Sequence, residues 1–267
     1  MADYEYVEVE SRDEVLSVWL NRPAVRNALD PQLITELTDC FGQQVPALKP
    51  RAVVLGGRGP VFCAGADLAY MREIAGYGPE QNRNDALRLA GLFEAVDSCP
   101  CPVVGRVQRG AFGGALGLIA CCDSVIATDD AIFSFPEVRL GIVAATIAPY
   151  VLAKIGISHA RDLLLSGERF SAAYALRIGL VHHCVSMAGL DGALKAKLSE
   201  LLMAGPQAAG ETKQLLRQLH GAPSAAVREQ TASLIASVRA SAEGQEGLAA
   251  ALGKRPPGWQ PLKTHEV

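Results

Sequence analysis

The chain has 267 residues, of which 25 are Lys or Arg and 28 are Asp or Glu, so its formal net charge is −3. Because 49% of the residues are hydrophobic, the chain can form a substantial core, which excludes an intrinsically disordered protein. The near-neutral charge excludes a general attraction to nucleic acid or to an anionic membrane, and no apolar run of about 18 residues predicts a membrane span.

The N-terminal part predicts a hairpin, a helix and a buried strand. Alternating apolar and polar residues over Tyr6–Leu20 predict two antiparallel strands. Asp30 followed by Pro31 is typical of a helix N-cap and first helical position, and Leu33–Phe41 has apolar residues at helical spacing. The continuous apolar run Ala52–Leu55 predicts a strand that is covered on both faces.

The central part continues the alternation of strands and helices. A helix over about 83–98 is followed by an apolar strand at 102–107, a glycine-rich turn at 110–114 and a helix that ends near 122, and further strands are predicted at 124–127 and 132–135. Beyond residue 144 the pattern is mostly helical, with a last helix over about 224–252. Apolar strands that alternate with helices predict an α/β fold.

The cysteines and the N-terminus indicate the compartment. The seven cysteines are an odd number, and their spacing forms neither a disulfide framework nor a zinc pattern, so we expect buried, reduced thiols and no metal. The acidic first 20 residues resemble no targeting peptide. Both features favour a cytoplasmic protein.

Two glycine-rich junctions are the strongest candidates for a site. They are Phe62–Leu68 (FCAGADL) and Ala111–Gly117 (AFGGALG), where a strand gives way to a helix. Neither has the spacing of a phosphate loop or of a dinucleotide-binding turn. Small side chains leave backbone N–H groups uncovered, so two of them can bind one oxygen atom; close packing of strand on helix is the alternative.

Six motifs together identify a family resemblance. They are Asn21-Arg22-Pro23, RNAL at 26–29, FCAGADL at 62–68, Gly113-Gly114, Cys122-Asp123 and FPEVRLG at 135–141. In this order the chain resembles the enoyl-CoA hydratase/isomerase (crotonase) family over nearly its whole length. The resemblance implies an α/β spiral of ββα units in residues 1–200, a helical region in 201–267 that takes part in oligomerisation, and assembly as a homotrimer or homohexamer.

The same resemblance implies the residues that bind an acyl-CoA thioester. Ala66 and Gly114 would supply the two N–H groups of an oxyanion hole. The residues that would bind coenzyme A and the substrate are Arg26, Ala28, Ala64, Asp67, Leu68 and Lys254. A solvated surface lysine is the alternative for Lys254. Coenzyme A is part of the substrate, so no separate cofactor is expected.

Glu137 is the predicted catalytic acid, and no second catalytic glutamate is predicted. Hydratases of this family usually carry two glutamates, and the position of the first is occupied by Gly117 here. One carboxylate can add water by taking a proton from it and returning that proton to the neighbouring carbon, and it can equally move a proton during double-bond isomerisation. The count of acids therefore leaves a hydratase and an isomerase open.

Further segments narrow the resemblance to one bacterial branch. GADLAYM at 65–71, Gly117, FPEVRLGI at 135–142 and APYV at 148–151 are similar to enzymes that hydrate 3-methylglutaconyl-CoA in leucine breakdown or isohexenylglutaconyl-CoA in acyclic terpene breakdown. Such substrates carry a second carboxylate, for which Arg139, Arg72 and Arg83 are candidates. A salt bridge for Arg139 and a solvated helix face for the other two are the alternatives.

A member that binds acyl-CoA or RNA without catalysis is the third hypothesis. The missing glutamate favours it, whereas the retained Glu137 and the net charge of −3 oppose it. The expected partner is therefore an acyl-CoA, with no nucleic acid and no membrane.

Overall fold

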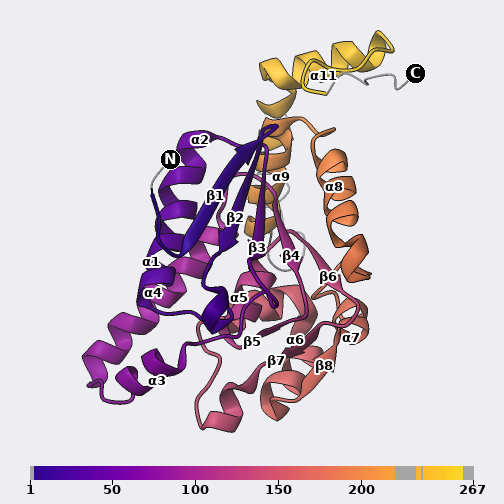
Figure 1. Ribbon diagram of the computed structural model, residues 1–267. Helices are drawn as coiled ribbons and strands as arrows, with labels where there is room; N and C mark the ends of the chain where they lie inside the picture. The colour runs from indigo at the N-terminus through magenta and orange to yellow at the C-terminus, as the bar shows by residue number, and fades with distance from the viewer. Residues whose placement is uncertain (1–2, 220–232, 236, 261–267) are drawn as a thin grey trace.

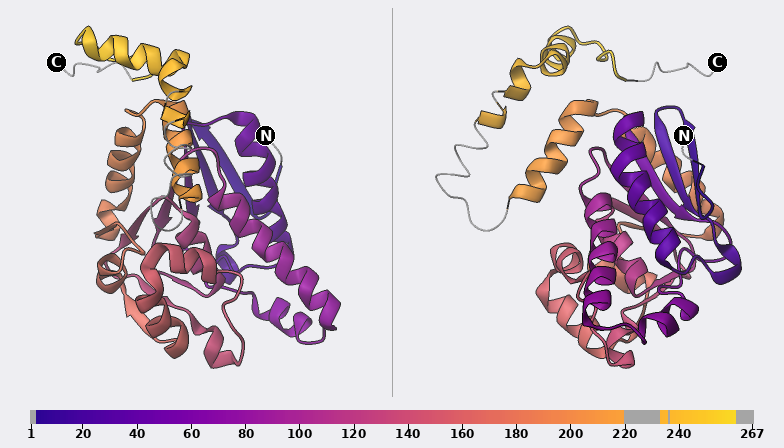
Figure 2. Two further views of the ribbon diagram at one scale, coloured as in Figure 1. Left: turned by 180° about the vertical axis from the view of Figure 1, so that it is seen from behind. Right: turned by 90° about the vertical axis from the view of Figure 1, so that its left-hand side faces the viewer.

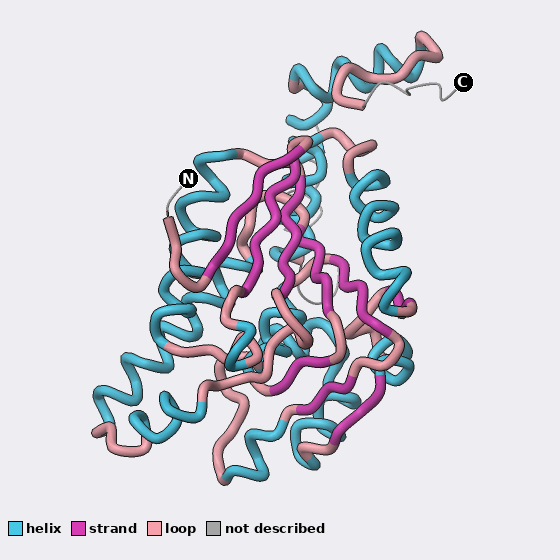
Figure 3. The backbone as a smooth tube through the Cα atoms, viewed as in Figure 1, coloured by secondary structure: helices cyan, strands magenta, loops and turns pink. Residues whose placement is uncertain are grey.

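In the computed structural model, residues 3–219, 233–235 and 237–260 are described, and they form two sheets surrounded by helices (Figures 1 and 3). The larger sheet has the order β1-β2-β3-β4-β6-β9, and only β1 and β2 pair antiparallel. Its strands are β1 (Val7–Arg12), β2 (Val15–Leu20), β3 (Ala52–Gly57), β4 (Val103–Val107), β6 (Ser124–Thr128) and β9 (His183–Val185). The smaller sheet consists of β5 (Gly110–Phe112), β7 (Ile132–Ser134) and β8 (Arg169–Ser171).

The predicted hairpin is confirmed. Its register runs from Val7 opposite Leu20 to Arg12 opposite Val15. The two turn residues, Asp13 and Glu14, have φ angles of 50° and 64°, as the twist of a two-residue hairpin turn requires.

The helices include the predicted ones, with shifted ends, and a short one at Val45–Leu48 that was not predicted. They are α1 (Pro31–Asp39), α2 (Val45–Leu48), α3 (Leu68–Ile74), α4 (Pro79–Asp97), α5 (Gly114–Cys121), α6 (Ala148–Ser166), α7 (Ala172–Arg177), α8 (Leu190–Leu201), α9 (Pro206–Gln218) and α11 (Ala242–Leu252). Asp30 caps α1 as expected, because its Oδ1 accepts a hydrogen bond of 2.8 Å from the N–H of Leu33. Helix α4 begins at Pro79, four residues before the predicted start.

Helices cover both faces of the larger sheet. On one face, α1 packs against α4, α4 against α5, and α5 against α6 (Figure 2). On the other face, α8 packs on β4 and β6, where Leu190 meets Val104 and Ile126. Neighbours in the strands, such as Val103 and Val125, belong to the main core, because successive side chains point to opposite faces.

Two predictions about local structure were wrong. The turn expected at 110–114 contains the short strand β5. The segment beyond residue 144 is mostly helical as predicted, although the three-residue strands β8 and β9 interrupt it. The helix expected over 224–252 lies partly outside the described residues. Within them it is broken at Ser241, which is extended (φ −67°, ψ 159°) and caps α11 with its side chain.

The cysteines match the expectation of buried thiols. All seven are free, six are buried and Cys184 is half-buried. Among the described residues, no helix has the length and apolar character needed to cross a bilayer. In the same part of the chain, no three His, Cys, Asp or Glu side chains lie close enough to hold a metal ion.

Candidate active site

The two glycine-rich junctions run side by side. Cys63 forms a parallel bridge with Ala111, so the segment after β3 is aligned with the segment that leads into α5. Gly65 has a φ angle of +91°, and a Cβ atom there would lie 2.7 Å from the carbonyl oxygen of Phe112. A glycine is therefore required for the two segments to approach this closely.

Leu29 links the two amides that the resemblance assigns to the oxyanion hole. Its carbonyl oxygen accepts a hydrogen bond of 2.9 Å from the N–H of Asp67, and its N–H donates one of 2.7 Å to the carbonyl oxygen of Gly65. These two bonds, on either side of Ala66, pair Leu29 with Ala66 in a parallel bridge. In this parallel bridge the N–H of Ala66 itself points away from Leu29. A Cβ atom on Gly114 would lie 3.1 Å from Cδ1 of Leu29, so both residues belong to one site.

The N–H groups of Ala66 and Gly114 are available to a ligand. Gly114 is the first residue of α5, where N–H groups have no acceptor within the helix. Among the described residues, neither N–H has a hydrogen-bond partner. Ala66 is also exposed, so an oxygen atom can reach it. A common focus of the two N–H groups stays a prediction.

Glu137 lies at the same end of α5. It belongs to the 3₁₀ turn Pro136–Leu140, and a Cβ atom on Gly113 would lie 3.0 Å from its Oε1. Its Oε2 is buried and has no hydrogen-bond partner among the described residues. Burial raises the pKa of Glu137 above that of an ordinary glutamate, as a residue that exchanges protons near neutral pH requires.

The structure leaves no room for a second acid at Gly117. This residue is buried on α5, and a Cβ atom there would lie 2.3 Å from Cγ2 of Ile147 and 2.7 Å from Cε1 of Phe93. Real Cβ atoms do not approach so closely. The absence of the first glutamate is thus part of how α5 packs against its neighbours.

Four of the predicted CoA-binding residues lie beside this site. The carbonyl oxygen of Arg26 accepts a hydrogen bond of 3.0 Å from the N–H of Ala64, which joins the two segments. Ala28 is buried, and its N–H donates to the carbonyl oxygen of Val25 while its own carbonyl oxygen accepts from Arg22, whereas Leu68 is 71% exposed at the start of α3.

The predicted role of Asp67 overlaps with a structural one. Its Oδ1 caps α3 by accepting from the N–H of Ala69 at 2.8 Å, and its Oδ2 pairs with Arg22 at 3.3 Å. Both carboxylate oxygens are therefore engaged within the protein.

Lys254 is not brought to the site within one chain. It follows α11, which lies at the top of Figure 1, whereas α3 and α5 lie in the lower half. The view from the side in Figure 2 also places α11 away from them. Lys254 has no ion-pair partner among the described residues.

The arginines considered for a distal carboxylate differ in their environment. Arg139 donates through Nε to the carbonyl oxygen of Ser166 at 3.0 Å. Arg72 and Arg83 are exposed and have no ion pair among the described residues. Thus the salt bridge weighed for Arg139 is absent from the described part of the chain.

Two residues that sequence reasoning did not single out hold the site together. Asn27 is fully buried, and its Nδ2 donates to the carbonyl oxygens of Arg58 and Phe62 at 2.8 and 3.0 Å. The guanidinium of Arg22 pairs with Asp30 at 3.0 Å as well as with Asp67. Both lie in motifs that carried the family resemblance, which was the available signal.

Comparisons with known proteins identify the family of the chain. The sequence profile described as enoyl-CoA hydratase/isomerase matches residues 10–261. The enoyl-CoA hydratase ACTT6 of Alternaria alternata is 31% identical over 273 aligned positions, covering 97% of this chain and 89% of that protein.

Solved structures show the same architecture. An enoyl-CoA hydratase from Shewanella pealeana is similar with a TM-score of 0.92 and 38% identity, over 96% of both chains. AtuE of Pseudomonas aeruginosa has a TM-score of 0.92 and 36% identity, over 96% of this chain and 100% of that one. The α/β crotonase fold with a helical C-terminal region is confirmed, and the chain belongs to the enoyl-CoA hydratase/isomerase family.

Proposed function

We propose that this protein is a hydratase that adds water across the α,β double bond of a branched glutaconyl-type acyl-CoA, either 3-methylglutaconyl-CoA or isohexenylglutaconyl-CoA. The observation that carries the hydratase assignment is the position of Glu137. Its carboxylate is buried against Gly113, one residue before the free N–H of Gly114. Relatives of similar length that are named enoyl-CoA hydratases support the same reaction class.

In the proposed mechanism, one carboxylate serves both steps. Glu137 takes a proton from water while the water oxygen bonds to the β-carbon and the electron pair of the double bond moves toward the thioester. The resulting enolate oxygen accepts hydrogen bonds from the N–H groups of Ala66 and Gly114, each worth about 3 kcal/mol. Glu137 then returns its proton to the α-carbon, which completes a syn addition.

The glutaconyl acyl group is proposed from the resemblance of four segments to one branch of the family. A substrate with a second carboxylate needs donors at the far end of the acyl group. The candidates are the exposed guanidinium groups of Arg72, Arg83 and Arg139, which have no ion pair among the described residues.

The biological setting is proposed on the same ground. We expect a role in leucine or acyclic terpene degradation, a cytoplasmic location, and a homotrimer or homohexamer formed with the help of residues 201–267. In such an assembly, Lys254 would reach coenzyme A phosphates across a subunit boundary.

A substrate panel tests the acyl group and the reaction class. Crotonyl-CoA, 3-methylglutaconyl-CoA and isohexenylglutaconyl-CoA are compared by kcat/KM, and a preference for the diacids supports the proposal. Equal or better turnover of crotonyl-CoA contradicts the glutaconyl assignment. Conversion of a 3-enoyl-CoA to the conjugated isomer without water uptake would make the enzyme an isomerase, and binding without turnover would make it a non-catalytic member.

A substitution tests the catalytic residue. Glu137→Gln keeps the shape of the side chain and removes the base, so kcat should fall by about 10²–10⁴-fold. The control is Glu168→Gln, the same change at an exposed position, which should leave kcat unchanged. Retention of activity within about tenfold in Glu137→Gln contradicts the mechanism.

A further inference from the structure

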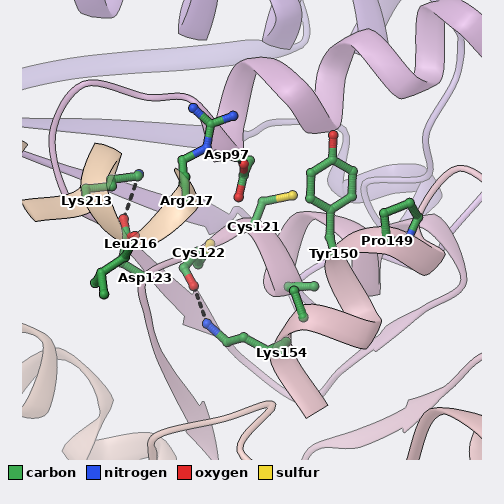
Figure 4. A pocket seen from close by; sticks show the side chains of 12 residues that line it. Asp97, Cys121, Cys122, Asp123, Pro149, Tyr150, Lys154, Lys213, Leu216 and Arg217 are labelled. Atoms are coloured by element: carbon green, nitrogen blue, oxygen red, sulfur yellow. Dashed lines mark hydrogen bonds and ion pairs between the residues drawn. The ribbon is translucent and has the colours of Figure 1, made fainter. Parts of the chain in front are cut away.

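A cavity of about 570 Å³ lies at the far end of α5 from Gly114. It is bounded by the end of α4, the C-terminal turn of α5 and the facing sides of α6 and α9 (Figure 4). Its polar lining residues are Asp97, Asp123, Tyr150, Lys154, Lys213 and Arg217. A volume of this size falls within the range of small-molecule sites. We call it the α5–α6–α9 cavity.

The charges around this cavity do not balance. Lys213 pairs with Asp123 and Arg217 pairs with Asp97, each at 2.7 Å. Lys154 is the third cation, and among the described residues it has no carboxylate partner. The lining therefore carries one positive charge in excess.

The unused hydrogen-bonding groups are donors. The ammonium of Lys154 has three N–H donors, and one of them binds the carbonyl oxygen of Cys122 (Figure 4). Arg217 uses only Nε in its hydrogen bond to Asp97. The hydroxyl of Tyr150 has no hydrogen-bond partner among the described residues. A set of free donors with an excess positive charge is complementary to an anion.

The remaining lining is apolar. Ala120, Pro149, Ala153 and Leu216 border the same cavity. A hydrated inorganic anion gains nothing from such a surface, whereas a carboxylate with a short hydrocarbon body buries that body against it. Burial in these surroundings also lowers the pKa of Lys154, a cost that a bound anion would offset.

We propose that the α5–α6–α9 cavity is a second binding site, which takes a small carboxylate with a short apolar body. Lys154 binds the carboxylate with the two N–H donors that its hydrogen bond to Cys122 leaves unused, whereas the Tyr150 hydroxyl and the Arg217 guanidinium lie on the other side of the cavity (Figure 4). The site is separate from Glu137 and does not depend on the proposed hydratase function. Both sites are connected through α5, which begins at Gly114 and ends at Cys121.

Binding of butyrate to the full-length protein tests this proposal. Isothermal titration calorimetry and thermal unfolding are measured with butyrate at constant ionic strength, with butyramide as the neutral analogue and inorganic phosphate as the purely polar anion. Butyrate should bind and raise the unfolding midpoint, because a ligand of the folded state stabilises it. Butyramide and phosphate should bind at least about tenfold more weakly.

Variants locate the bound butyrate. Lys154→Met should weaken binding by about tenfold or more, whereas Lys154→Arg keeps the charge and should retain most of the affinity. Tyr150→Phe removes only a hydroxyl on the other side of the cavity, so it is the control variant and should bind butyrate as the wild type does. Glu137→Gln should bind butyrate as the wild type does.

Three results would overturn the proposal. The first is equal binding of butyrate by the wild type and Lys154→Met in folded protein. The second is equal binding of butyramide, which would show that the negative charge is not recognised, or tighter binding of phosphate, which would show that the apolar body is not recognised. The third is loss of butyrate binding in Glu137→Gln, which would place the ligand in the candidate active site instead.

Discussion

The surroundings of Glu137 are unfavourable for a charged side chain, which a purely structural role does not explain. Its carboxylate is partly buried, one oxygen has no partner among the described residues, and its pKa is raised by burial. Such a carboxylate destabilises the fold when charged, yet it is well suited to exchange protons with water and carbon. Activity and stability should therefore respond in opposite directions when this side chain is neutralised.

The raised pKa of Glu137 predicts the acid limb of the pH profile. The base must be deprotonated, so kcat/KM should fall as the pH drops through a pKa above that of an ordinary glutamate. Steady-state rates from about pH 4 to about pH 9 measure this limb. A limb at the ordinary glutamate pKa would contradict the burial argument.

The same shift predicts the effect of Glu137→Gln on stability. Because the pKa is raised in the folded state, the charged form costs stability above that pKa, and the cost disappears below the pKa of the unfolded chain. Glu137→Gln should thus be more stable than the wild type near pH 8, and not near pH 4. Urea unfolding at both pH values measures this difference, and an equal effect at both would refute it.

A substitution of Gly117 tests how closely α5 packs against its neighbours. Gly117→Ala places a Cβ atom against Ile147 and Phe93, so it should destabilise the protein by about 1–3 kcal/mol. The matched control is Gly91→Ala on α4, where a Cβ atom would meet nothing within 4 Å and the helix should gain up to about 1 kcal/mol. Thermal unfolding compares the two, and an unchanged midpoint in Gly117→Ala would show that α5 can shift.

At the scale of elements, the loops of the site are held in place by contacts with the N-terminal ends of α1 and α3. Arg22 contacts the N-caps of both α1 and α3, Asp30 and Asp67, and its NH1 donates to the carbonyl oxygen of Ala28 at 2.5 Å. Asp67 directly follows Ala66. Arg22 therefore fixes the peptide that carries one of the proposed oxyanion N–H groups.

Replacement of Arg22 should affect catalysis more than binding. Arg22→Met releases Asp67, and a shift of the Ala66 amide should lower kcat by about tenfold with a smaller change in KM. Arg22→Lys should restore part of kcat. Asp30→Asn serves as the control, because it weakens the other ion pair of Arg22 and leaves Asp67 in place. If KM alone rises in Arg22→Met, the residue does not position the oxyanion hole.

Elements with local signals could be predicted, and those made by distant pairing could not. Asp30-Pro31 fixes the start of α1, and the alternation up to Leu20 fixes the hairpin. Strand β8 has three residues and exists because Phe170 pairs with Phe133 from the distant β7. The break at Ser241 was not predicted because the residues on both sides of it favour a helix. Beside the break, Glu243 accepts hydrogen bonds from the N–H groups of Gln207 and Ala208 in α9, a contact between segments far apart in the sequence.

At the scale of the molecule, a buried lysine of α9 forms hydrogen bonds with the core. Lys213 donates to the carboxylate of Asp123 at 2.7 Å and to the carbonyl oxygen of Cys101 at 3.2 Å. Both acceptors adjoin strands of the larger sheet. This lysine thus joins the C-terminal helices to the part of the chain that carries the candidate active site.

Lys213→Met should loosen this attachment. It removes both hydrogen bonds and should destabilise the protein by about 2 kcal/mol, with faster amide exchange in α9 than elsewhere. Lys195→Met, at an exposed position on α8, is the control and should have little effect. Unchanged exchange in α9 would mean that the other contacts of the helix, among them the ion pair of Arg217 with Asp97, hold it in place without Lys213.

The sequence by itself determined the family, the α/β class, the two glycine-rich junctions and the solitary Glu137, because these depend on residue types at short spacing. Only the tertiary structure decided that Leu29 joins the two junctions, that Phe93 and Ile147 close the space beside Gly117, and that α6 and α9 enclose a cavity around Lys154. These features are contacts between segments far apart in the chain. Their geometry follows from how the elements pack, which no local pattern encodes.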